Sequence, residues 1–131
     1  MEGNYFITAS HDYSASPAQI YSLIGKGKLF QLTGAETVNF IFSENAPFEL
    51  IFKSGTVRGQ FMKIIENEKI ILEWDSDGFN REPEKGTKVW VTLLGDEKHT
   101  TLALEHREIP TEESALSKKK SWERILEELV K

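Results

Sequence analysis

His106 is the polar residue whose surroundings most suggest chemistry. The run from Thr100 to His106 alternates in the manner of a strand, which places Leu102, Leu104 and His106 on one face, toward the core. A neutral imidazole there could hydrogen-bond a ligand oxygen or transfer a proton. The alternative is a structural histidine at the end of a sheet, bonded to a backbone carbonyl or a Glu, or exposed to solvent.

The positions of two tryptophans predict one wall of a cavity. Trp74 shares a strand face with Ile70 and Leu72, and Trp122 begins an apolar stripe on a C-terminal helix that continues through Ile125. If the strand face is concave, the two indoles meet and suit a flat apolar ligand. Plain core packing is the alternative. The candidate cavity residues are Trp74, Leu72, Leu102, Leu104, His106, Trp122 and Ile125. Trp90, between two valines, should face the other way.

The basic cluster Lys118 to Lys120, together with Arg124, stands out in an acidic chain. We expect it on a solvated helix face, paired with acidic residues of the same helix: Glu123, Glu127 and Glu128. An acidic partner or an anionic ligand is the alternative. The acidic residues from Glu66 to Asp77 are also expected to be solvated, because alternation and turns scatter them.

The sequence lacks the motifs of metal binding, phosphate binding and covalent catalysis. The three histidines show no metal-ligand spacing and the chain has no Cys, so we expect no metal site and no thiol nucleophile. The segment Gly25 to Lys28 ends a helix and lacks the spacing of a phosphate loop, and no serine lies in a nucleophile elbow. We therefore expect neither a cofactor nor covalent catalysis.

The elements that must position these residues follow from periodicity and turn signals. A strand is expected over Asn4 to Tyr13, then a helix that Ser16 caps and Pro17 begins, then a short helical turn over Leu29 to Leu32. Thr111 should cap a last helix of about 18 residues, long enough to cross the sheet. Between them we predict a long loop over 75–86 and six strands, at 36–43, 48–53, 56–66, 69–75, 87–94 and 99–107.

Composition limits the class of protein. With 131 residues and a net charge of −5, the chain fits a single domain over 1–131 and gives no general attraction to nucleic acid. We expect no membrane insertion, because no stretch reaches about 18 apolar residues. The N-terminus has no basic and apolar leader pattern, so the expected location is cytoplasmic.

Several segments, taken in order, resemble a known family. They are Gly59 with the strand ending Ile64-Ile65-Glu66, the run Lys69 to Trp74, the run Thr87 to Leu93, the run Thr100 to His106, and Trp122 to Leu129. The set is similar to the activator of heat-shock protein 90 ATPase homologue family, within the START-like (SRPBCC) superfamily. The resemblance implies an α+β helix-grip (Bet v 1-like) fold, in which a curved antiparallel sheet of seven strands wraps around a long C-terminal helix.

The sequence is compatible with three functions. The first is a START-like module that binds a hydrophobic or amphipathic small molecule between the sheet and the last helix. The second, implied by the family's name, is a stress-related regulator that interacts with a chaperone ATPase of the heat-shock protein 90 type. The third is an enzyme resembling the polyketide cyclases and aromatases of the superfamily, with His106 as acid or base. A non-enzymatic role is favoured, because no second polar group converges with His106.

Overall fold

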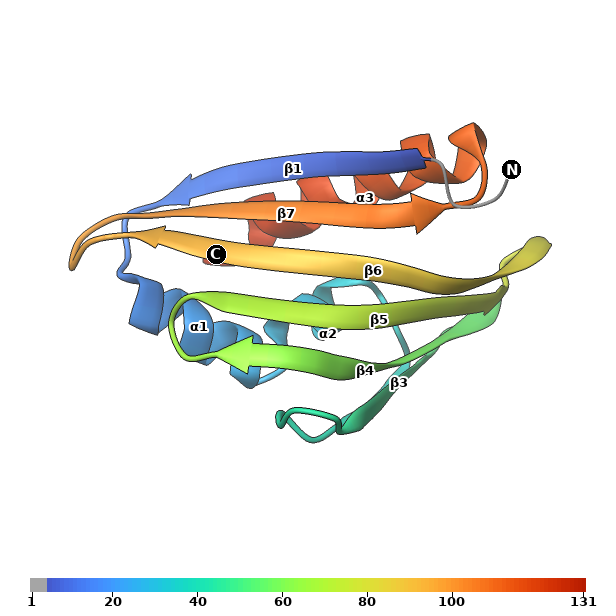
Figure 1. Cartoon of the computed structure of the whole chain (residues 1–131), viewed down its shortest axis with the longest axis horizontal. Helices are drawn as coiled ribbons and strands as arrows, with labels where there is room; N and C mark the ends of the chain where they lie inside the picture. Colours follow the sequence, from blue (N-terminus) through green and yellow to red (C-terminus); the bar gives the residue numbers. More distant parts are fainter. Residues whose placement is uncertain (1–4) are drawn as a thin grey trace.

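A computed structural model describes residues 5–131 (Figure 1). The elements in chain order are β1 (Tyr5–Tyr13), α1 (Pro17–Gly25), α2 (Lys28–Leu32), β2 (Thr37–Phe40), β3 (Pro47–Ile51), β4 (Gly55–Ile65), β5 (Lys69–Gly78), β6 (Arg81–Gly95), β7 (Thr100–Ile109) and α3 (Glu112–Glu128). The strands form one antiparallel sheet in the order β1-β7-β6-β5-β4-β3-β2, and the helices lie on one of its faces. The predicted α+β fold is confirmed; Asn4, placed in the first predicted strand, lies outside the described residues.

Helix α3 begins where the sequence predicts. The Thr111 side chain accepts a hydrogen bond from the backbone N–H of Ser114, and Glu112 and Glu113 occupy the positive end of the helix dipole. Its apolar stripe, which includes Trp122 and Leu126, is buried against the sheet. Among the described residues, no helix is both long and apolar enough to cross a membrane.

Helix α1 is also capped as expected. Ser16 accepts from the backbone of Gln19, whose side chain bonds back to the backbone N–H of Ser16, and this capping box precedes Pro17 in the first turn. Gly27, with φ of 90°, separates α1 from α2, and Leu29 and Phe30 of α2 are buried. Both helices thus cover the half of the concave face that α3 leaves free.

The predicted loop over 75–86 is wrong. Strand β5 continues to Gly78 and β6 starts at Arg81, so only Phe79 and Asn80 form the turn, with φ of 59° and 58°. Positive φ at both central residues is the geometry of a tight hairpin turn. The register shifts twice beyond the pair Trp74 and Thr87, first between Trp74 and Ser76 and again between Ser76 and Gly78. These bulges increase the local bend of the hairpin.

Strand β2 is shorter than predicted. The strand expected over 36–43 covers only Thr37–Phe40, and the chain then turns through Asn45, which has φ of 67°. The backbone N–H of Asn45 donates to the carbonyl of Phe61 on β4, and the N–H of Phe61 donates to the carbonyl of Ala46, so this segment extends the pairing of β3 with β4 and not strand β2. A short edge strand offers little unpaired backbone to another chain.

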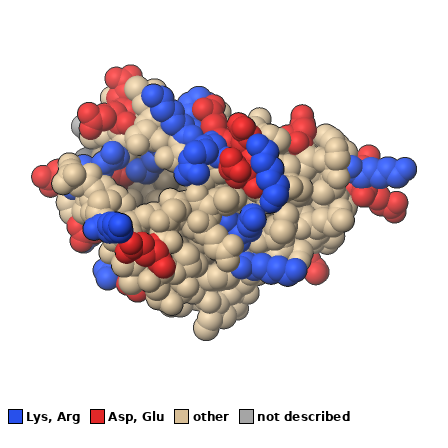
Figure 2. Space-filling view, turned by 180° about the vertical axis from the view of Figure 1, so that it is seen from behind, with Lys and Arg blue, Asp and Glu red and all other residues tan. Residues whose placement is uncertain are grey.

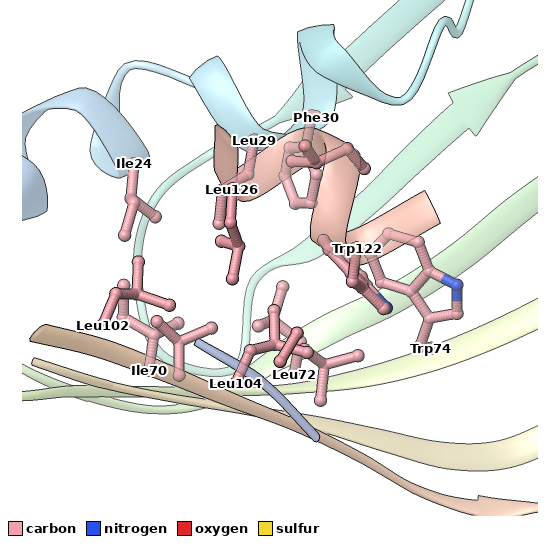
Figure 3. Close-up of a cluster of buried hydrophobic side chains, with 14 of the residues drawn as sticks. Ile24, Leu29, Phe30, Ile70, Leu72, Trp74, Leu102, Leu104, Trp122 and Leu126 are labelled. Carbon is pink, nitrogen blue, oxygen red and sulfur yellow. The ribbon is translucent and has the colours of Figure 1, made fainter. Parts of the chain in front are cut away.

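The core lies between the concave face and the helices. Figure 3 shows the side chains of α1 and α2 above, those of β5 and β7 below, and Trp122 and Leu126 of α3 between them. Trp90 faces the other way, as predicted. It is half-buried under the Arg107 guanidinium, which lies 4.1 Å from the ring centroid, a cation–π geometry.

Candidate functional site

A hollow of about 290 Å³ lies between α3 and one end of the sheet. Its apolar wall consists of side chains from the β3–β4 connection, β4, the β5–β6 hairpin and α3: Phe52, Val57, Trp74, Phe79, Trp122 and Ile125. Trp74 and Trp122 form one side of it, edge to face, with ring centroids 5.3 Å apart, and Figure 3 shows them adjacent. The hollow opens to solvent beside Ser117 and Ser121, which are exposed on α3.

The remaining lining is polar and basic. Three cationic side chains reach the hollow, Arg81 from the hairpin and Lys118 and Arg124 from α3. Hydroxyl groups complete it, from Thr33, Ser76, Ser117 and Ser121. Figure 2 shows the face from behind, with Lys and Arg side chains bordering a hollowed region. An apolar wall beside cationic groups suits a molecule with one apolar and one polar end.

The bent hairpin brings Phe79 and Arg81 to this place. Phe79 holds a left-handed backbone conformation that is costly for a bulky residue. Its backbone N–H bonds to the carbonyl of Ser54 at 2.7 Å, and its ring packs edge to face on Phe52. These contacts fix Phe79 over the hollow and place Arg81 two residues later at the rim.

Lys118 does not lie on a solvated face as predicted. Its ammonium donates to Glu84 Oε1 at 2.7 Å and to Ser114 Oγ at 2.8 Å, and the Glu84 side chain is only 3% exposed. Burial lowers the pKa of Lys118 below its ordinary value, against the charge and hydrogen bond of Glu84, which act to raise it. The cause is helical spacing: Lys118 precedes Trp122 by four residues and therefore shares its inward face.

The rest of the basic cluster lies mostly on the surface. Lys119 pairs with Glu123 at 3.3 Å, as predicted for the solvated face, and also donates to the backbone carbonyl of Thr8. Lys120 is exposed. Arg124 donates to the carbonyl of Leu32 at 3.3 Å, which turns its guanidinium toward the end of α2 and the hollow.

His106 is fully buried on the core face of β7, as alternation predicts, but its partners differ from those expected of a structural histidine. Its Nδ1 accepts from the Trp122 indole N–H at 3.1 Å, and its Nε2 lies 2.9 Å from Thr87 Oγ1. Because the indole can only donate, the proton of the neutral ring is on Nε2. Burial, followed by the charge of Lys118, lowers the pKa of His106 well below its ordinary value.

The fold and this geometry can be compared with known proteins. A family model described as "Activator of Hsp90 ATPase homolog 1-like protein" matches residues 15–131. The chain belongs to this family. The resemblance drawn from the segments between Gly59 and Leu129 is thus confirmed. Among curated proteins, none matches the sequence.

Solved structures share the fold of this family member. A protein from Mesorhizobium loti has a TM-score of 0.82 at 14% identity, over 95% of this chain and 93% of that one. The Aha1 dimer from Colwellia psychrerythraea has a TM-score of 0.73 at 18% identity, over 94% and 92%. An HSP90 activator from Plasmodium falciparum has a TM-score of 0.68 at 20% identity, over 91% and 88%.

The candidate residues of this family member divide between the hollow and the core. Trp74, Trp122 and Ile125 line the hollow. Leu72 lies deeper, at a gap of about 10 Å³ beneath α2, a volume too small to hold a ligand. Leu102, Leu104 and His106 are fully buried in the packed centre and do not reach the hollow. The space between sheet and helix is therefore filled in the middle and open at one end.

Sequence reasoning missed the hairpin side of the hollow. Phe79 and Arg81 belong to the segment that was predicted as a loop, and Glu84, the buried partner of Lys118, belongs to it too. Phe52 follows β3, although the sequence predicts it inside the strand over 48–53. One signal for a tight turn was present, because Gly78 precedes Phe79 and Asn80 in a run where Asn tolerates positive φ.

Proposed function

We propose that this protein binds a hydrophobic or amphipathic small molecule in the hollow between α3 and the β5–β6 hairpin. The observation that carries the proposal is the wall of aromatic and aliphatic side chains around a space of about 290 Å³ that opens to solvent. This volume is at the lower end of ligand pockets, which span roughly 300–1,000 Å³. The fitting ligand is therefore a compact one, in contact with Trp74 and Trp122.

Ser121 provides the test of this proposal. It lines the hollow from an exposed position on α3, so Ser121→Phe should fill the space without opening the core. Lys120→Phe, on the exposed face of the same helix, is the matched control. We expect 1-octanol and 2-naphthol to shift the backbone amide resonances of hollow residues in the wild type and in the control, and to lose this effect in Ser121→Phe. Equal binding to Ser121→Phe would place the ligand elsewhere, and no binding of either probe would overturn the proposal.

A second candidate function is a stress-linked regulator of a heat-shock protein 90 type ATPase. It is favoured by membership of the family and by the fold shared with the HSP90 activator from Plasmodium falciparum. The test is to measure capture of the chaperone by this protein and the change in its ATPase rate. No capture and no change of rate would remove the candidate.

An enzymatic role through His106 receives no support from the geometry. Both ring nitrogens bond to protein groups, and the imidazole does not line the hollow. A general acid or base must come within hydrogen-bonding distance of the reacting atom. His106 therefore serves the core, and ligand binding without acid–base catalysis is the function that the site supports.

A further inference from the structure

We propose that the hollow selects molecules that carry an anionic head group, a carboxylate or a phosphate, on a small apolar body. Arg81, Lys118 and Arg124 bind the head group, and Trp74 and Trp122 contact the body. The inference rests on the proposed function, because it names the class of ligand for the same hollow.

The charge around the hollow is opposite to that of the whole chain. The protein has a net charge of −5, from 16 basic and 21 acidic residues. Among the described residues, three basic ones and no acidic one line the hollow. Glu84 lies just behind the lining and offsets one of the three charges, so the local sum is +2. A recess with one sign of charge and apolar walls attracts a ligand of the other sign.

Lys118 and Arg81 keep donors that a ligand can use. The Lys118 ammonium gives two of its three N–H groups to Glu84 and Ser114. Arg81 donates from Nη1 to Ser114 Oγ at 3.1 Å, and the same nitrogen is 4.0 Å from Glu84 Oε2. Because a guanidinium carries five donors in a planar fork, Arg81 can still bind a carboxylate or phosphate through two parallel bonds.

Arg124 contributes charge without a carboxylate partner among the described residues. Its recorded hydrogen bond goes to the backbone carbonyl of Leu32, at 3.3 Å, and a neutral acceptor does not compensate the charge. Arg124 is exposed on α3 beside the opening of the hollow. Arg81 and Arg124 thus approach the hollow from two elements, the hairpin and the helix, and Lys118, whose side chain is 13% exposed, lines it as well.

The size of the hollow limits the apolar body. A space of about 290 Å³ lies at the lower end of ligand pockets, which span roughly 300–1,000 Å³. It admits one medium-length alkyl chain or one fused aromatic pair. A lipid with two long chains does not fit.

Four probes with the same octyl chain test the head-group preference: octanoate, octyl phosphate, 1-octanol and octylammonium. Calorimetric titration of the full chain at low ionic strength should show at least one anion binding roughly 10- to 100-fold more tightly than 1-octanol, the worth of a hydrogen bond to a charged group. Octylammonium should bind least. Comparison of octanoate with octyl phosphate shows which anionic head is preferred.

Substitutions of Arg81 and Arg124 test whether these residues cause the preference for an anionic head group. Arg81→Gln and Arg124→Gln should each weaken binding of the preferred anion about tenfold, the effect of one charged hydrogen bond, and leave 1-octanol unchanged. Arg58→Gln is the control, because Arg58 pairs with Glu49 at 2.7 Å outside the hollow. Circular dichroism checks that each variant is folded.

The outcomes separate the two proposals. If 1-octanol binds as tightly as both anions, or if neither arginine variant changes anion binding, the head-group inference fails and the hollow remains a general apolar site. If none of the four probes binds, the proposed function fails together with it.

Discussion

The indole N–H of Trp122 donates to Nδ1 of His106 at 3.1 Å and so connects helix α3 to strand β7 inside the core. The hydrogen-bonded chain continues from His106 Nε2 to the hydroxyl of Thr87, and from that hydroxyl to the backbone carbonyl of Trp74. Each donor in this chain finds an acceptor, and among the described residues no buried side-chain nitrogen or oxygen lacks a partner. This series of hydrogen bonds therefore orients Trp122 at the wall of the hollow.

Trp122→Phe should destabilise the protein by about 1–3 kcal/mol through the lost hydrogen bond, because it leaves His106 Nδ1 buried without a donor, and the missing five-membered ring adds a cavity cost. Urea unfolding measures the loss. Trp90→Phe is the control, since Trp90 is on the outer face of the sheet, where its ring lies under the Arg107 guanidinium. Equal effects of the two substitutions would contradict the role assigned to the Trp122 bond.

The buried His106 predicts a particular dependence of stability on pH. Its pKa is lowered in the folded state. At a pH below the ordinary histidine pKa of about 6.5, His106 therefore binds a proton in the unfolded chain and stays neutral in the folded one. Stability should then fall as pH decreases from that value toward the lowered pKa, by up to about 1.4 kcal/mol per pH unit from this group. His106→Gln cannot titrate, and its free energy of unfolding should fall less steeply between pH 6.5 and 5. Parallel curves for the two proteins would be the contrary result.

Lys118→Met should cost about 3–5 kcal/mol, because the buried carboxylate of Glu84 loses its ammonium partner and is left with the Arg81 guanidinium, at 4.0 Å. The double substitution Lys118→Met with Glu84→Gln removes the stranded charge and should be more stable than the single one. Lys120→Met, on the exposed face of α3, should change stability by less than about 0.5 kcal/mol. Thermal or urea unfolding of the three variants checks this, and a double variant no more stable than Lys118→Met would refute the pairing argument.

Phe79 offers a test of backbone strain at the hairpin. Phe79→Ala and Phe79→Gly both lose the ring contact with Phe52, but only Gly adopts φ of 59° without strain. Phe79→Gly should therefore be more stable than Phe79→Ala by about 1 kcal/mol in urea unfolding. If Ala is the more stable of the two, the left-handed conformation at this position costs less than assumed.

Much of the fold could be predicted because local signals and tertiary packing agree. Ser16 with Pro17 and Thr111 with Glu112 are strong helix starts, and the apolar stripe through Trp122 has helical spacing. The strands that contain Leu72 and Leu104 combine β-branched residues with alternation. In these segments the local preference and the position in the core favour the same structure.

The hairpin could not be predicted from such signals. The residues from Asp75 to Gly86 include two glycines, a proline and several charged residues, a composition typical of loops. These residues nevertheless pair as strands. The backbone N–H of Gly86, which has φ of 76°, donates to Asp75 Oδ1, and a bulge at this point accommodates one extra residue of β6 in the ladder. Bulges depend on this long-range pairing, which spacing along one chain does not reveal.

The candidate site was predicted on its apolar side and missed on its charged side. Trp74 and Trp122 are large apolar residues at inward positions, so alternation and helical spacing both indicate them. Lys118 precedes Trp122 by four residues and so lies on the same inward face of the helix. A lysine is rarely buried without a partner, however, so the spacing alone does not predict its burial. Its partner Glu84 is 34 residues away in the sequence, and no local pattern connects the two.

The hydroxyl of Tyr13 donates to the carbonyl of Leu126, a contact between residues 113 positions apart. Strand β1 likewise pairs with β7, so that Tyr13 lies opposite Thr100. During synthesis, β1 must therefore wait for most of the remaining chain before it finds its neighbour, whereas β3 to β7 can pair in sequence as they emerge. Contacts of such separation slow folding. We expect β1 to stay unpaired until β7 has left the ribosome, and the contact of Tyr13 with Leu126 to form only after α3 has followed.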